Sequence, residues 1–336
     1  MAFLSGRPRW RVLLVAGSAI VAAGCGSPDA AGAPNGSATE TDVAAGDVAQ
    51  TPVPVAPVVT EAAPATPAPT SAPSEVRILP LDGDLAEVVF ALGLGDQVVA
   101  TDISATYPPE ADALPEIGYQ RSLAAEPIAA FEPTIVLATD LAGPPEVLDE
   151  LERLGFTVVM IPTESTPDGP GIKIRAVADA LGVPDRGETL AAEVDAAIAA
   201  AMQRAETAPT APRVGVLYLR GSNVQLLFGE GTDVDWIVDA VGAVSIADEL
   251  GGVDAAPITA EALVLAAPDV LIVPERGLES VGGVDGLLEL PGIAATPAGA
   301  ARRVLTYDDQ LLLGNGPRTG ALLDQLITDL HGGTTE

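Results

Sequence analysis

The sequence predicts an α/β protein made of two similar lobes with mostly parallel sheets, joined by a long rigid bridging helix. The first observation is the alternation of short apolar runs with amphipathic segments, which is typical of β-α units in a parallel sheet. The second is an internal copy, since the segment around Glu126 and Pro133 recurs around Glu261 and Pro268. The third is an Ala-rich run over residues 186–206, which predicts a helix about 30 Å long that can bridge two lobes. Copies so far apart indicate two lobes rather than a solenoid, whose repeats recur about every 20–50 residues.

The first 25 residues have the features of a targeting segment. Arg7, Arg9 and Arg11 make the start positive, and the apolar run 12–23 is too short to span a bilayer comfortably. The run ends in small residues before Cys25 and resembles a bacterial lipoprotein signal, which is cleaved before a cysteine that then carries lipid. This predicts an extracytoplasmic protein anchored to the cell membrane by lipid. A plain secretory signal that happens to contain a cysteine is the alternative.

Residues 26–75 consist almost wholly of Ala, Pro, Thr, Ser, Gly, Asp and Val. This composition buries too little apolar surface to offset the entropy cost of folding, so we expect a disordered tether. The remaining sequence divides into an N-terminal lobe (76–170), a bridging helical segment (171–212) and a C-terminal lobe (213–333).

Apolar periodicity and the positions of Gly and Pro predict the elements of these lobes. The expected strands cover 77–81, 97–100, 135–138, 157–161, 213–219, 270–273 and 304–306. The expected helices cover 83–92, 144–154, 171–181, 186–206, 260–266, 283–290 and a terminal segment from 320, with a further element at 233–241.

Composition excludes several classes of function. In 336 residues, 47 Asp plus Glu against 16 Lys plus Arg give a formal net charge of −31. Such a polyanion repels phosphate backbones, so no nucleic-acid partner is expected. The only cysteine and the only histidine, Cys25 and His331, allow neither a Cys/His zinc cluster nor an intrachain disulfide. Any metal must therefore be bound through oxygen atoms of Tyr, Asp, Glu or carbonyl groups.

Two Tyr-x-Arg motifs are the most informative local patterns. Tyr119 and Arg121 follow Gly118 in a predicted turn, whereas Tyr218 and Arg220 end a predicted strand. In extended backbone, residues i and i+2 point to the same face, so each guanidinium is expected beside the phenol. A cation there lowers the pKa of a phenol from its usual value near 10, and phenolate is a hard donor suited to ferric iron. The motifs therefore indicate iron bound by tyrosine.

Six segments spread over residues 76–333 have sequences that are shared with a known protein family. They are 78–84, 91–100, 107–109, 114–121, 260–261 and 312–318. In these segments the chain resembles the haem-binding lipoproteins that supply bacterial ABC importers. They form part of a wider group of periplasmic binding proteins with a rigid helical backbone, class III, which also serves siderophores and cobalamin. The resemblance implies that the protein is not an enzyme, that it captures ferric haem between its lobes as a transported ligand, and that iron is bound only through haem.

The resemblance also implies roles for individual residues. It places an axial iron ligand at Tyr119, supported by the Arg121 cation. Some relatives add a His or Tyr from the facing lobe; since no His is available there, Tyr218 with Arg220 is the candidate. Whether both tyrosines bind iron at once stays open, because Tyr119 could instead pack its ring on the lobe and Tyr218 could be a half-buried core residue.

Three further residues are weaker candidates for ligand contact. Tyr107 is the other tyrosine of the first lobe and could also touch the ligand. Arg276 and Arg318 follow strand or loop ends of the second lobe and could pair with haem propionates, although ordinary surface ion pairing is the better explanation for each.

Glu126 and Glu261 occupy equivalent places in the internal copy, so a two-lobed protein presents one carboxylate per lobe. In the family, glutamates at these places form salt bridges to arginines of the permease, and a homodimeric permease could receive both on the same basic patch. The alternative is a helix N-terminal carboxylate favoured by the helix dipole. The expected partners are thus haem, an ABC-transporter permease dimer and the membrane through the lipid anchor, for a protein that is itself a monomer.

Two other functions compete with haem capture. A siderophore or corrinoid (cobalamin) carrier of the same transporter class would show a pocket without tyrosines converging from the two lobes. A surface enzyme would need a nucleophile and base other than His or Cys, which leaves only carboxylate-based hydrolysis.

Overall fold

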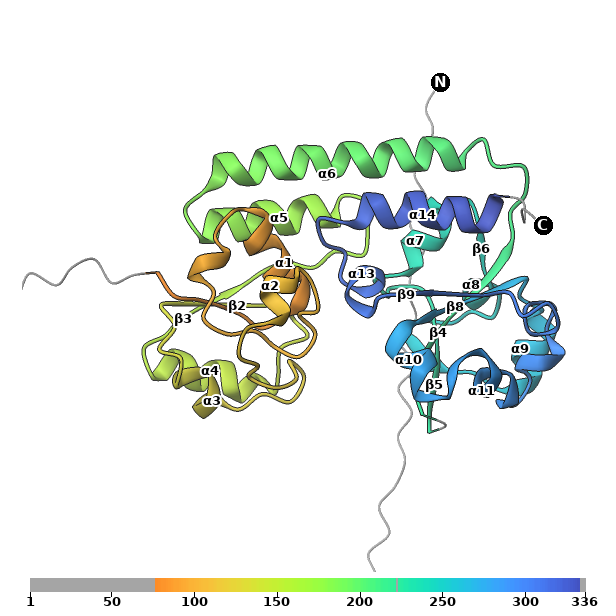
Figure 1. Ribbon diagram of the computed structural model, residues 1–336, viewed down its shortest axis with the longest axis horizontal. Helices are drawn as coiled ribbons and strands as arrows, with labels where there is room; N and C mark the ends of the chain where they lie inside the picture. Colours follow the sequence, from red (N-terminus) through yellow and green to blue (C-terminus); the bar gives the residue numbers. More distant parts are fainter. Residues whose placement is uncertain (1–75, 222, 333–336) are drawn as a thin grey trace, which may run out of the picture. The chain divides into compact units, whose positions relative to one another are not determined.

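The computed structural model describes residues 76–221 and 223–332 (Figure 1). The predicted signal segment 1–25 with Cys25, and the predicted tether 26–75, lie outside the described residues. Among the helices that the structure describes, none combines the length and apolar character needed to cross a membrane.

The first lobe contains a three-stranded sheet in the order β1-β2-β3, with all strands parallel. Its strands are β1 (Ile78–Pro80), β2 (Ile135–Ala138) and β3 (Thr157–Met160). Helices cover its faces because the crossover between parallel strands must return along the sheet. They are α1 (Gly83–Ala91), α2 (Pro109–Asp112), α3 (Ala125–Ala129) and α4 (Pro145–Arg153).

The second lobe contains a six-stranded sheet in the order β7-β5-β4-β8-β9, with β6 paired to β4. Its strands are β4 (Arg213–Arg220), β5 (Val224–Phe228), β6 (Val244–Ser245), β7 (Ala255–Pro257), β8 (Val270–Pro274) and β9 (Val304–Tyr307). Its helices are α7 (Asp235–Ala240), α8 (Ile246–Glu249), α9 (Ala260–Ala266), α10 (Glu275–Ser280), α11 (Gly283–Glu289) and α12 (Pro297–Ala300). Strands β6, β4, β8 and β9 are parallel, whereas β5 runs antiparallel to β4 and β7.

Helix α6 (Pro184–Ala205) connects the lobes and packs against α5 (Gly169–Ala180) and α14 (Thr319–His331) (Figure 1). Small residues permit this close approach. A Cβ on Gly187 would lie 2.2 Å from the Ala178 Cβ, and one on Gly320 would lie 2.6 Å from the Ala197 Cβ. With 22 residues, α6 is about 33 Å long, so the prediction of a long bridging helix is confirmed.

One apolar core crosses from lobe to lobe beneath these helices. It includes Ile78 and Leu85 of the first lobe, Ile198 of α6, and Val214 and Leu326 on the side of the second lobe. Because folded cores are close-packed, a shared core resists movement of one lobe against the other. The predicted fold class, two α/β lobes on a rigid helical backbone, is confirmed.

The internal copy is also visible in the backbone. Helices α3 and α9 each lead into a buried parallel strand, β2 and β8 respectively. In both copies the residue before the shared proline has a left-handed conformation, with φ of 46° at Glu132 and at Ala267. Such a conformation is uncommon in residues other than glycine, so its recurrence marks one supersecondary unit used twice.

Two element predictions differ from the structure. The strand expected at 97–100 is wrong: residues Gly95–Gln97 form a short 3-10 helix, η1, and only Val98 pairs with Ile78, as an isolated bridge. The hairpin of β4 and β5 was not predicted, because Val224–Phe228 was not recognised as a strand. The second sheet is therefore mixed, and the first is fully parallel.

Candidate binding site

The first Tyr-x-Arg motif lies in a tight turn of the first lobe. Gly118 has φ of 103°, a conformation that side chains rarely adopt, and it directs the chain into the turn. The Ser122 N–H donates to the Tyr119 carbonyl at 2.8 Å, which closes the turn around Arg121. The Tyr119 side chain is 38% exposed. The backbone here is not extended, so the same-face expectation does not apply to this motif.

The second Tyr-x-Arg motif lies at the end of β4, where the same-face prediction is confirmed. The Arg220 guanidinium carbon lies 4.3 Å from the centroid of the Tyr218 ring. On β5, Phe228 contacts the same ring edge-on, with centroids 5.7 Å apart and planes at 63°. Tyr218 is thus half-buried between an aromatic ring and a cation, which holds its orientation.

Charged groups of both lobes act on the Tyr218 phenol. Burial raises the pKa of this phenol above its ordinary value; Arg220 and Arg121 act to lower it, and Tyr119 and Asp309 act to raise it. Tyr119 and Arg121 belong to the first lobe, so the Tyr218 phenol lies within electrostatic reach of both across the lobes. The expected net lowering of the phenol pKa is wrong for Tyr218, because the loss of hydration outweighs the two cations.

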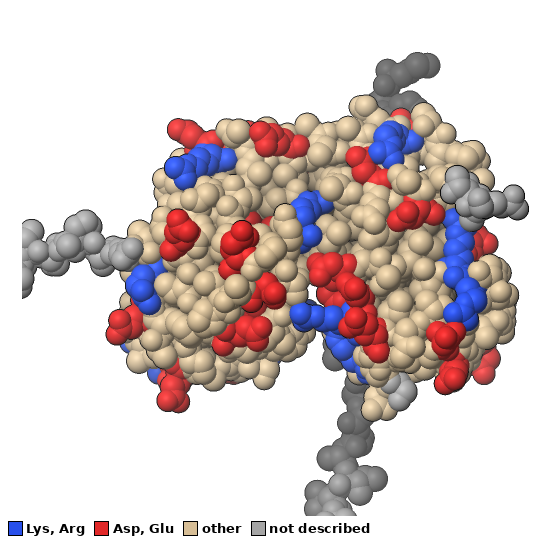
Figure 2. Space-filling view, in the orientation of Figure 1, with Lys and Arg blue, Asp and Glu red and all other residues tan. Residues whose placement is uncertain are grey.

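Asp309, in α13 (Asp309–Leu313), anchors the cationic side of this site. Its carboxylate accepts from the Arg220 guanidinium at 3.2 Å and from the Arg276 backbone N–H at 3.0 Å. The Arg276 guanidinium donates across the lobes to the Ile103 carbonyl at 3.3 Å. In contrast, Arg121 forms no ion pair or hydrogen bond with any residue that the structure describes. Basic and acidic side chains lie side by side on the surface where the lobes meet (Figure 2).

Tyr107 and Arg318 contact each other rather than the two Tyr-x-Arg motifs. The Arg318 guanidinium carbon lies 3.8 Å from the centroid of the Tyr107 ring. Arg318 also forms a bidentate ion pair with Glu87 of α1, through Nε at 2.8 Å and Nη2 at 2.9 Å. The Arg318 guanidinium is therefore already neutralised, in contrast to Arg121.

A buried charge cluster lies at the junction of the lobes and α5. Lys173, the only lysine of the chain, forms an ion pair with Asp84 and donates to the Gly314 carbonyl at 2.8 Å. Burial acts to lower the pKa of Lys173, but Asp84, Asp82 and Asp233 together leave it raised. Burial also raises the pKa of Asp82 and of Asp233.

Glu126 and Glu261 take equivalent places in the structure as well as in the sequence. Each lies in the first turn of its helix, α3 and α9 respectively, and each side chain is exposed. The two carboxylates are therefore accessible to a partner, one on each lobe.

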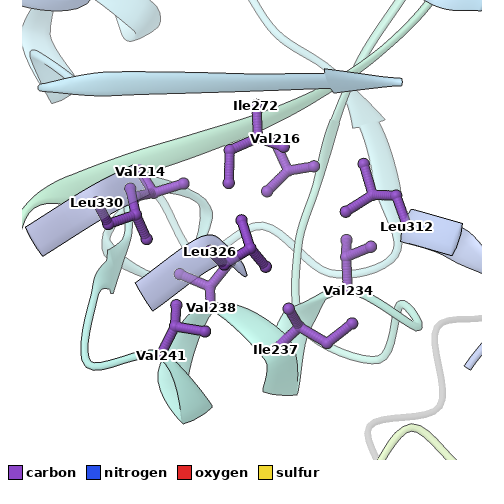
Figure 3. Close-up of a pocket in the computed structure, with 10 residues that line it drawn as sticks. All are labelled: Val214, Val216, Val234, Ile237, Val238, Val241, Ile272, Leu312, Leu326 and Leu330. Atoms are coloured by element: carbon purple, nitrogen blue, oxygen red, sulfur yellow. The ribbon is translucent and has the colours of Figure 1, made fainter. Parts of the chain in front are cut away.

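The apolar cavity of the second lobe is poorly suited to orient a ligand. The cavity in Figure 3 lies inside the second lobe and is lined only by Val, Ile and Leu side chains, so it has no polar group to orient a ligand. Within residues 76–221 and 223–332, no cluster of His, Cys, Asp or Glu side chains could hold a metal ion.

The sequence prediction missed Asp309, Gln310 and Lys173. Only Lys173 carried a signal, because a single lysine within an apolar helical run is unusual. The other two residues act through contacts with remote segments, which no local pattern indicates.

Two α/β lobes on a rigid helical backbone, with convergent side chains at their junction, define a substrate-binding protein rather than an enzyme. Residues 78–311 match the periplasmic binding protein family, and the chain belongs to it. Members of this family are extracytoplasmic binding proteins, which confirms the coarse functional class predicted from the sequence.

Solved structures of haem-binding proteins have the same fold. The periplasmic haem-binding protein RhuT from Roseiflexus sp. RS-1, in apo form, is 48% identical with a TM-score of 0.76, covering 77% of this chain and 99% of that one. The haem-binding protein HmuT is 36% identical with a TM-score of 0.71, covering 77% of this chain and 85% of that one.

A curated relative has a different ligand in its name. The vitamin B12-binding protein of Vibrio cholerae is 31% identical over 115 residues, which is 34% of this chain. This match spans only 41% of the relative's length. The protein therefore belongs to the class that binds haem, siderophores or cobalamin.

Proposed function

We propose that the protein captures ferric haem between its two lobes and delivers it to an ABC importer for the uptake of haem and iron. The observation that carries this proposal is the Arg220 guanidinium over the Tyr218 ring, 4.3 Å from its centroid, with Tyr119 and Arg121 of the other lobe within electrostatic reach of the phenol. A corrinoid or siderophore pocket has no need for two facing tyrosines, each with an arginine two positions later.

The chemistry of the site suits ferric iron. An iron-bound phenol must lose its proton, so haem binding releases protons and its affinity rises with pH. Arg121 and Arg220 both favour the ionised form of Tyr218, which burial alone would keep protonated. Tyr119, in the exposed turn, is the main ligand, and Tyr218 is the second ligand or a close contact of the porphyrin.

The propionates need cations at the rim of the site. Arg121 has no ion-pair partner among the described residues, and only a carbonyl accepts from the Arg276 guanidinium. These two arginines are therefore the propionate partners that we favour. Arg318 is a weaker candidate because Glu87 and the Tyr107 ring already engage it.

The names of the solved relatives support haem over cobalamin. Variants of HmuT have been solved in which a tyrosine and the arginine two positions after it are each replaced by alanine. Tyr218 and Arg220 have the same spacing. The structure of BhuT, 35% identical with a TM-score of 0.70, holds two haems.

Delivery to a permease is part of the proposal. Glu126 and Glu261 each present a carboxylate from an equivalent helix, and a two-fold symmetric permease dimer can bind both through identical basic patches. A lipid on Cys25, which lies outside the described residues, would keep the protein at the membrane where the importer is.

The test is an absorption titration with haemin of the wild type and of Tyr119→Phe, Tyr119→Ala and Tyr218→Phe variants. Tyr119→Phe keeps the ring and removes only the oxygen, so loss of the phenolate-to-iron charge-transfer band identifies a ligand rather than a packing residue. Tyr307→Phe is the matched control and should bind as the wild type does, because the Tyr307 hydroxyl donates to Asp329 of α14. A parallel titration with cyanocobalamin decides the alternative: tight corrinoid binding together with a spectrum equal to free haemin would refute haem capture.

A further inference from the structure

A single side chain of the second lobe, Gln310, joins it to an irregular loop of the first. Its Oε1 accepts from the backbone N–H groups of Thr106 and Tyr107, both at 2.8 Å, and from the Thr106 hydroxyl at 3.1 Å. Its Nε2 donates to the carbonyls of Gly83 at 2.8 Å and Tyr107 at 3.0 Å, and to Glu87 at 3.0 Å. The amide thus uses both of its ends to bind two separate stretches of the first lobe, α1 and the loop at Thr106 and Tyr107.

This arrangement requires an amide at position 310. Gln310 is 7% exposed, so water cannot replace the contacts that it makes. A carboxylate could accept from the loop but could not donate to Glu87 and two carbonyls, and an apolar side chain could do neither. A buried group with every partner satisfied holds its surroundings in one geometry.

Neighbouring contacts reinforce the same junction. The Thr106 hydroxyl donates to Asp308 at 3.2 Å, and Arg318 binds Glu87 while it stacks on Tyr107. We call the set formed by Glu87, Thr106, Tyr107, Gln310 and Arg318 the interlobe clamp. It fastens α1 and the 104–107 loop to α13 and the start of α14.

The interlobe clamp is continuous with the supports of both tyrosines. In the first lobe, the Ile103 N–H donates to the Gly118 carbonyl at 3.0 Å, so the loop that Gln310 grips also holds the residue before Tyr119. In the second lobe, Asp309 next to Gln310 binds Arg220, which stacks on Tyr218.

We propose that Gln310 is a positioning residue that sets the separation of Tyr119 and Tyr218. This inference rests on the proposed function for its effect on haem, but not for its effect on the lobes. The clamp holds the lobes at the spacing that lets two ligands from opposite sides meet one porphyrin iron. Tyr107 and Arg318 then serve the site through lobe spacing rather than through contact with the ligand.

The first experiment measures lobe spacing without haem. Spin labels on Ala130→Cys and Leu265→Cys, both at exposed positions on opposite lobes, report the interlobe distance by double electron–electron resonance on a Cys25→Ser background. Gln310→Met keeps the volume and removes every hydrogen bond of the amide, and it should broaden the distance distribution. Gln203→Met, at an exposed position of α6, is the matched control and should leave the distribution unchanged.

The second experiment measures haem in the same variants. Gln310→Met should speed haem release roughly tenfold, since small misplacements of positioned groups have large effects, and should move the spectrum toward that of Tyr218→Phe. Thr106→Val removes one hydroxyl only and should show the same changes to a smaller extent, which keeps the test valid if Gln310→Met does not fold.

The outcomes separate the two proposals. An unchanged distance distribution in Gln310→Met overturns the clamp, and so does a broadened distribution with unaltered haem spectrum and release. If the wild type binds no haem while Gln310→Met still broadens the distribution, the proposed function fails and the clamp stands as the device that spaces Tyr119 and Tyr218.

Discussion

Arg220 lies over the face of the Tyr218 ring, with its guanidinium carbon 4.3 Å from the ring centroid, while the same guanidinium is paired with Asp309. The cation therefore acts on the phenol through the ring face, and its charge is shared with a carboxylate. This explains why burial, and not the arginine, decides the direction of the Tyr218 pKa shift.

Replacement of Arg220 by Ala should shift the pH midpoint of haem binding to a higher pH. Arg220 lowers the pKa of Tyr218 against the effect of burial, so its loss raises this pKa further and leaves less phenolate at a given pH. We expect the midpoint of the charge-transfer band in a pH titration of the haem complex to move upward. Arg153→Ala, at an exposed position of the first lobe, should leave the midpoint in place. A downward shift in Arg220→Ala would contradict this account.

Replacement of Lys173 by Met should destabilise the fold strongly. Lys173 and Asp84 are both buried, and removal of one partner leaves an uncompensated charge at a cost of about 3–5 kcal/mol. Chemical denaturation monitored by circular dichroism measures the free energy of unfolding. Arg204→Met breaks an exposed ion pair with Asp324 and should cost at most about 1 kcal/mol. Equal losses of unfolding free energy in the two variants would mean that burial does not increase the contribution of the Lys173–Asp84 ion pair to stability.

Asp102 should make stability fall as pH rises through the weakly acid range. Burial raises its pKa from 3.8 to about 6, although a hydrogen bond from the Ser104 hydroxyl at 2.7 Å opposes the shift. Since the folded state holds this proton more tightly than the unfolded state, the contribution is fully present below about pH 4 and is lost as pH rises through about 6.

The measurement for Asp102 is the difference in unfolding free energy between Asp102→Asn and the wild type at several pH values. Titrating groups that do not interact with Asp102 cancel in this difference, which should grow in favour of the variant by about 2 kcal/mol between pH 4 and 7. A difference that stays constant with pH would show that the Asp102 carboxyl titrates normally.

Charge reversal at Glu126 or Glu261 should abolish delivery without affecting capture. Each glutamate is exposed and neither belongs to a Tyr-x-Arg motif, so haem affinity should be that of the wild type. Haem transfer to the reconstituted importer should fall for Glu126→Lys and Glu261→Lys, and most for the double variant. Glu146→Lys is the matched control, because Glu146 is also an exposed glutamate in the first turn of a helix, α4. If Glu146→Lys impairs transfer equally, the helix dipole or net charge is responsible rather than docking.

Much of the fold was predictable because its signals are local. Alternating apolar runs located most strands of both sheets, and the Ala-rich composition of residues 186–206 located α6. The prediction of a strand at 97–100 was wrong because Gly93 and Gly95 allow a tight 3-10 turn. The spacing of apolar residues does not reveal such a turn. The β4–β5 hairpin was missed because Val224–Phe228 was not recognised as a strand. In the structure this segment pairs with β4 in antiparallel orientation.

The sequence by itself determined the two-lobed repeat through backbone periodicity, and the class of binding protein through its resemblance to a known family. The chemistry of two short motifs also indicated the tyrosines and arginines that we propose serve ferric iron. Tertiary structure alone decided that Arg318 pairs with Glu87, that burial governs the Tyr218 phenol, and that Gln310 fastens one lobe to the other. The physical reason is that desolvation and hydrogen bonding between residues about 200 positions apart depend on how the lobes pack, and no local pattern carries that information.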